Sequence, residues 1–91
     1  MNLYLLTQTV NCGYDTYDSC VVCAESAEEA KTYHPNSQDR WINNKWIYPD
    51  TLSPEWGNGS WAIFECVTAT LIGSAVAGTK PGVVIASFNA G

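Results

Sequence analysis

Basic residues are scarce in this sequence. Only four of its 91 residues are Lys or Arg, against nine Asp or Glu, and the formal net charge is −5. Proteins hold phosphate backbones with clusters of Lys and Arg. Here the four basic side chains are dispersed along the chain, at Lys31, Arg40, Lys45 and Lys80. We therefore do not expect nucleic acid as a partner.

Long apolar runs and catalytic signatures are also missing from the sequence. No run approaches the roughly 20 residues that cross a bilayer, so we expect no membrane association. Residues 78–80 are Gly-Thr-Lys but lack the rest of a phosphate-binding loop. Ser60 and Ser87 have no nucleophile-elbow motif around them. We expect a protein that is not an enzyme and that uses no cofactor and no metal ion.

Cysteine occurs four times, and two disulfides are one alternative. However, the N-terminus has no basic segment of a secretory signal, and cytosolic proteins keep their thiols reduced. We therefore expect a cytoplasmic protein in which Cys12, Cys20, Cys23 and Cys66 are reduced. Cys20 and Cys23 have CxxC spacing, but residues three apart on a strand point to opposite faces, so they would not share a metal ion.

Hydrophobic residues make up 46% of the chain and eleven residues are aromatic, which is enough for the core of a single domain over 1–91. Apolar patterning predicts strands over 2–8, 17–24, 60–73 and 83–88. Ser26 and Glu29 have capping-box spacing, which predicts a helix of about two turns that ends before Pro35. The order β-β-α-insert-β-β predicts an α+β fold with about four mainly antiparallel strands and one short helix packed on the sheet.

The segment 36–60 is the aromatic-rich insert, and we expect irregular structure held by buried indoles. Its residues 41–42 and 46–48 are compatible with short strands or a helical turn, with Asn43 and Asn44 forming the bend. Four tryptophans lie between 41 and 61. Three interpretations are open: core residues, an association surface, or a stacking pocket for a planar ring with phosphate held by basic side chains and ring edges contacted by Asn43, Asn44 and Asn58. The candidate ligand-binding residues are Trp41, Trp46, Arg40, Lys45, Asn43 and Tyr48.

Two further groups have the chemistry of a catalytic site but a simpler interpretation. Asp15 and Asp18 could act as an acid–base pair or as cation ligands, yet Asp is an ordinary turn residue and no third oxygen-rich partner follows. His34 is the single histidine. A nucleophilic Cys–His pair would need a thiol beside it, whereas a histidine at the end of a helix commonly contacts the free carbonyls there.

Several segments carry a resemblance that spans nearly the whole chain. They are LYLLTQ, NCGYDTYDSCVVCA followed by ESAEEAK, the His-Pro pair after the helix, and the terminal GVVIASFNAG. Together they resemble a family of small hypothetical proteins from bacteriophages and prophages. The resemblance implies a phage accessory protein in the bacterial cytoplasm and brings no catalytic motif or cofactor.

Small phage proteins of this kind include many that blunt host defences, some by binding a protein and others by sequestering a nucleotide signal. We therefore expect a non-enzymatic protein that binds a host-derived target, either a nucleotide-like small molecule or a host protein. The alternative is a structural or assembly module, or a protein inhibitor that acts through an exposed aromatic or acidic surface including Glu25, Glu28 and Glu29. Exposed apolar surface on the final strand or the insert predicts a homo-oligomer.

Overall fold

The structure is a computed structural model that describes residues 1–10, 16–37, 39–48, 53–54 and 61–89. Its main element is a four-stranded sheet with the order β6-β1-β2-β7. The strands are β1 (Asn2–Thr7), β2 (Thr16–Ala24), β6 (Thr68–Ser74) and β7 (Gly82–Asn89), and every neighbouring pair is antiparallel. The predicted four-stranded antiparallel sheet is confirmed, and the sequence-adjacent strands β1 and β2 occupy its centre.

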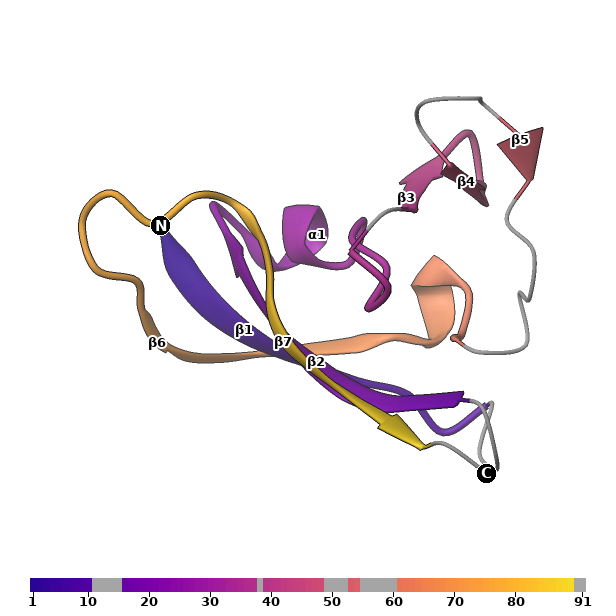
Figure 1. Ribbon diagram of the computed structural model, residues 1–91, viewed down its shortest axis with the longest axis horizontal. Helices are drawn as coiled ribbons and strands as arrows, with labels where there is room; N and C mark the ends of the chain where they lie inside the picture. The colour runs from indigo at the N-terminus through magenta and orange to yellow at the C-terminus, as the bar shows by residue number, and fades with distance from the viewer. Residues whose placement is uncertain (11–15, 38, 49–52, 55–60, 90–91) are drawn as a thin grey trace.

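One face of this sheet is the core face. Tyr4 pairs with Val22 and Leu6 with Cys20, and these four side chains are buried. Their neighbours in sequence point to the other face because side chains alternate along a strand. The helix α1 (Ala27–Ala30) and a second, three-stranded sheet over residues 40–54 both lie on the core side (Figure 1). The opposite face carries apolar residues such as Leu5 and Val21 without any described element over it.

The helix α1 (Ala27–Ala30) is one turn long, so the prediction of two turns is wrong. Its start is as expected: Ser26 is extended and its hydroxyl accepts from the Glu29 amide at 3.2 Å. The Glu29 carboxylate accepts from the amide of Glu25, one residue before the expected partner. After Ala30 the bonds tighten to the i→i−3 type, since the amides of Thr32 and Tyr33 donate to the carbonyls of Glu29 and Ala30. Beyond this turn the carbonyl of Thr32 accepts from the Trp41 amide of the insert.

The insert contains regular structure where irregular structure was expected. Strands β3 (Arg40–Ile42), β4 (Lys45–Tyr48) and β5 (Ser53–Pro54) form an antiparallel sheet in that order. The short-strand alternative for 41–48 is therefore the one that the structure bears out. The bend lies at Asn43 and Asn44, whose φ angles are 53° and 65°. Positive φ at both central residues is the geometry of a type I′ hairpin turn, which Asn tolerates well.

The strand predicted over 60–73 begins later than expected. Residues Phe64–Cys66 form a short 3₁₀ helix, η2, and β6 starts at Thr68. The amides of Cys66 and Val67 donate to the carbonyls of Ile63 and Phe64, which closes this turn. Phe64 is thereby brought beside Trp41, with ring centroids 6.2 Å apart.

The core lies between the sheet and the covering segments. It joins Leu6 and Val22 of the sheet to Ala30 of the helix and to the indoles of Trp46 and Trp61. Cys20, Cys23 and Cys66 are free thiols, and Cys12 lies outside the described residues. As predicted, Cys20 and Cys23 leave β2 on opposite faces, since they pair with Leu6 and Leu3 respectively.

Candidate functional site

The β3–β4 hairpin positions two of the candidate indoles against each other. Trp41 and Trp46 are cross-strand partners, and their rings meet edge to face with centroids 5.2 Å apart and planes at 70°. Such aromatic pairs add about 0.5–1.5 kcal/mol beyond the area they bury. The type I′ turn sets this register, so the bend at Asn43 and Asn44 and the indole pair depend on each other.

Trp46 belongs mainly to the core. Only 4% of its surface is exposed, and its Nε1–H donates to the carbonyl of Ala62 at 3.0 Å. Its ring also meets the imidazole of His34 at a right angle, with centroids 5.1 Å apart. Trp61 is 1% exposed. For these two indoles the core interpretation is therefore the dominant one.

A hollow lies where the hairpin meets the segment before β6. Its volume is about 250 Å³, and its lining residues are Trp41, Asn44, Lys45, Trp46, Trp61 and Ile63. Trp41 is half-buried, and its ring is stacked within 21° of the plane of Phe64. Lys45 is exposed and leaves the strand on the face opposite Trp46, so it belongs to the rim of the hollow.

Arg40 does not take the expected place beside this hollow. Its guanidinium lies over the Tyr33 ring, 3.8 Å from the centroid, and donates to the carbonyl and the hydroxyl of Thr32. The reason is strand alternation: Arg40 precedes Trp41 on β3 and points to the other face. Among the described basic residues, Lys31 is also committed to a ring, with its Nζ 4.3 Å from the Phe64 centroid.

Two candidate residues remain, Asn43 and Tyr48. One lies in the turn, and the side chain of the other lies outside the described residues. Asn43 is exposed in the bend and does not line the hollow. The backbone of Tyr48 pairs with Ser53, but its side chain lies outside the described residues, as does Asn58. Ile63 was not among the candidates, and Trp61 was considered only as the last of the four indoles in the stacking-pocket interpretation. The end of the indole run at Trp61 was the one signal that could have pointed to them.

The His34 loop is a buried polar network. His34 is 1% exposed, and its Nδ1 accepts from the Asn36 amide at 3.1 Å. The Asn36 side chain in turn donates to the Asp39 carboxylate at 2.8 Å and accepts from the Asp39 amide. Burial lowers the pKa of His34 to about 4, against the opposing influences of Asp39 and Asn36. At neutral pH this imidazole is uncharged and serves to close the loop.

The thiols and carboxylates considered from the sequence lie in different surroundings. Burial raises the pKa of the Cys20 thiol to about 12, which keeps it protonated and unreactive. Asp18 is exposed at an irregularity of β2, and Asp15 lies outside the described residues. In the described ranges, no three His, Cys, Asp or Glu side chains gather where they could hold a metal ion.

In comparisons with known proteins, no family model, no curated protein and no solved structure matches the chain. Within the described residues, no helix has the length and apolar character needed to span a membrane. Function must therefore be inferred from the hollow and the surfaces of the fold.

Proposed function

We propose that this is a non-enzymatic phage accessory protein that binds a host-derived, nucleotide-like small molecule in the hollow of the β3–β4 hairpin. The observation that carries the proposal is that three residues with suitable groups line one hollow: Trp41 with a half-buried indole, Asn44 with an amide and Lys45 with an exposed ammonium. The resemblance to small phage proteins, and only that resemblance, suggests the host cytoplasm and defence evasion as the setting.

The chemistry of the hollow suits a flat ring with an anionic substituent. An indole stacked on a base contributes about 1–3 kcal/mol. Asn44 can donate to and accept from the edge of such a ring. Lys45 supplies a flexible ammonium for a phosphate. The whole chain is acidic, so this local cation matters for admitting an anion.

The size of the hollow narrows the ligand class. Its volume of about 250 Å³ is slightly below the ~300–1,000 Å³ of typical ligand sites. We therefore propose that one base enters and that the sugar and phosphate stay at the rim, near Lys45. A cyclic oligonucleotide would then be held by one of its bases.

A thermal-shift screen of the purified protein against cyclic oligonucleotides, ADP-ribose derivatives and common nucleotides tests the proposal. A ligand at 100 times its dissociation constant stabilises the fold by about 2.7 kcal/mol, which raises the Tm of a domain of this size by roughly 10–20 °C. Lys45→Gln should reduce the shift, and Lys80→Gln is its charge-matched control on the β6–β7 loop. Asn44→Gly removes the amide side chain without straining the positive φ of 65°.

Two outcomes would contradict this proposal. One is the absence of a shift with every compound at millimolar concentration. The other is a shift that survives Trp41→Leu and Lys45→Gln together, since the ligand would then bind elsewhere. Melting of the free variants separates loss of the site from loss of the fold.

A structural or protein-inhibitor module is the second candidate. Large apolar side chains remain exposed on the last strand, where Val84, Ile85 and Phe88 are 56%, 64% and 48% exposed. Glu25 and Glu28 are also exposed at the start of α1, although Glu29 is engaged in capping. If the ligand screen is negative, capture of a host protein that is lost on Glu25→Lys with Glu28→Lys would favour this candidate.

A further inference from the structure

The last strand, β7, forms one edge of the main sheet and lacks the usual protection of an edge. From Gly82 to Asn89 the strand contains no charged residue and no proline. Natural edge strands are commonly guarded by Lys, by Pro or by a covering segment. β7 has β2 on one side, and no other described strand pairs with it (Figure 1).

The exposed apolar residues of β7 lie on both faces of the sheet. Ile85 pairs with Val21 on the open face, whereas Phe88 pairs with Tyr17, which packs against the core. A covering layer would bury one of these faces only. A neighbouring strand would reduce the exposure of both faces, so a strand fits this pattern of exposure better than a covering layer does.

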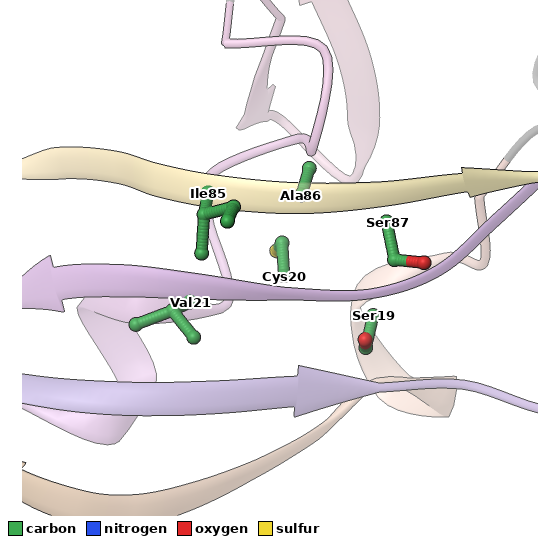
Figure 2. Close-up of a pocket in the computed structure, with 6 residues that line it drawn as sticks. All are labelled: Ser19, Cys20, Val21, Ile85, Ala86 and Ser87. Atoms are coloured by element: carbon green, nitrogen blue, oxygen red, sulfur yellow. The ribbon is translucent and has the colours of Figure 1, made fainter.

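The lining of the adjoining hollow is also uncharged, and the nearest charged residue of β2 is the exposed Asp18, between the residues that pair with Ser87 and Phe88. A hollow of about 160 Å³ lies between β2 and β7, and Figure 2 shows its lining residues from the two strands. They are Ser19, Cys20, Val21, Ile85, Ala86 and Ser87, all neutral. The hollow offers room for an apolar side chain beside the edge.

We propose that β7 pairs in antiparallel orientation with β7 of a second copy of this chain, which joins two four-stranded sheets into one of eight strands. A second β7 matches this edge because it has the same eight-residue length and also carries no charge. Two chains of net charge −5 repel each other in general, but the β7 edges bring no like charges together. The antiparallel arrangement also gives a two-fold, self-closing contact. This surface is separate from the ligand hollow.

The alternative edge is β6, where Leu71 and Ile72 are 60% and 52% exposed. Pairing of β7 with β6 of another copy would not close and would continue as a growing sheet. β7 is the longer of the two strands, and the register with β2 is continuous from Ser19 to Val21 opposite Ile85 to Ser87. A two-fold pairing through β7 is therefore preferred over a contact that involves β6.

Sedimentation equilibrium of the full chain measures the association directly. The contact between two eight-residue strands is smaller than the ~1,200 Å² of stable complexes, so the concentration range should run from about 1 µM to 1 mM. The mass should rise from 9.9 kDa towards twice that value and stop there. Amides of β7 should exchange more slowly with solvent as the concentration increases.

Four Lys variants identify the contact. Ile85→Lys should weaken association at least about tenfold, because it places an ammonium group on each of the two paired edges. Val76→Lys is the control, since Val76 is 79% exposed in the loop between β6 and β7. Ile72→Lys tests the β6 edge, and Thr70→Lys tests face-to-face packing of the two open faces. Neither should change the association.

Three results would overturn the proposal. The first is a monomer at 1 mM, in which case the edge serves another partner or none. The second is loss of association on Ile72→Lys or Thr70→Lys, which would assign the contact to β6 or to the open face. The third is a mass that grows beyond two copies. A thermal melt of each variant verifies folding, and the Val76→Lys protein supplies the reference.

Discussion

Acidification should destabilise this protein through His34. The imidazole is buried, and burial lowers its pKa to about 4 from an ordinary value near 6.5. Between these two pH values the unfolded chain binds a proton that the folded chain does not. The free energy of unfolding therefore falls as the pH drops from about 6.5, and the His34 contribution levels off below about pH 4.

The size of the effect follows from the same difference. A pKa that is about 2.5 lower in the folded state corresponds to a total loss of about 3 kcal/mol, of which about 2 kcal/mol is already lost at pH 5. Two kcal/mol should lower the Tm of a domain of this size by roughly 10 °C. Asp39 and Asn36 oppose the shift, so removal of the Asp39 charge should steepen the dependence on pH.

Urea unfolding at pH 7.5, 6.0 and 5.0, followed by tryptophan fluorescence, provides the measurement. The control is His34→Gln, in which the amide oxygen can accept from the Asn36 backbone amide as Nδ1 does. Carboxylate titration affects both proteins and cancels in the comparison. Equal slopes against pH for the two proteins would refute the reasoning. So would an NMR titration in which the ring of folded His34 has its midpoint near pH 6.5.

Three further changes test how the segments are held, each by urea unfolding at pH 7.5. Trp46→Phe should lower the free energy of unfolding by about 1–3 kcal/mol, because it leaves the Ala62 carbonyl without its indole donor. An unchanged free energy of unfolding would show that the hydrogen bond at 3.0 Å does not stabilise the fold. Arg40→Ala should lower the free energy of unfolding by about 1–2 kcal/mol, because it removes the contact with the Tyr33 ring and two hydrogen bonds. Lys45→Ala should change it by no more than about 0.5 kcal/mol. Equal effects of the two substitutions would contradict the different roles assigned to the two cations. Ser26→Ala should lower the free energy of unfolding by about 1 kcal/mol, because it removes the helix cap. Ser26→Asp is the control, since an Asp side chain can still accept from the Glu29 amide.

The sequence was informative where structure depends on local preferences. Alternating apolar residues predicted the four main strands, and Asn43 with Asn44 marked a bend because few other residues tolerate positive φ. The Ser26 cap followed from a spacing of three residues. Each of these features is encoded within a few positions of the chain.

The features that the sequence did not reveal depend on contacts between distant residues. Just beyond the single turn of the helix, the Thr32 carbonyl accepts from the amide of Trp41, nine residues later. The turn at 64–66 was predicted as strand, yet it brings Phe64 against Trp41. Neither contact produces a signal in the local pattern of hydrophobic residues.

The candidate site was predicted in part. Trp41, Lys45 and Trp46 line one hollow, since the indoles are cross-strand partners and Lys45 lies at the turn. Arg40 was misplaced because the insert was not expected to be regular. Once residues 40–42 form a strand, Arg40 points away from Trp41, and its contacts with the Tyr33 ring and with Thr32 hold it there, whereas Lys45 lies on the same face but next to the turn.

The β7 edge and the ligand hollow are linked by a series of ring contacts. Phe88 lies 4.8 Å from Tyr17, Tyr17 lies 5.9 Å from His34, and His34 lies 5.1 Å from Trp46, measured between centroids. Such continuity would transmit a signal only if one of these rings had two arrangements that the two sites favour differently. His34 and Trp46 are each fixed by burial and by a hydrogen bond, which argues for a single arrangement.

We therefore expect binding and association to be independent. Ile85→Lys should abolish the dimer and keep the thermal shift produced by any nucleotide found in the screen, and Lys45→Gln should reduce that shift and keep the dimer. Saturation with the nucleotide should change the dimer dissociation constant by less than about twofold, or about 0.4 kcal/mol of coupling. A larger change would mean that the ring series has a second arrangement. His34→Gln, which interrupts the series at its centre, should then remove the coupling while both activities remain.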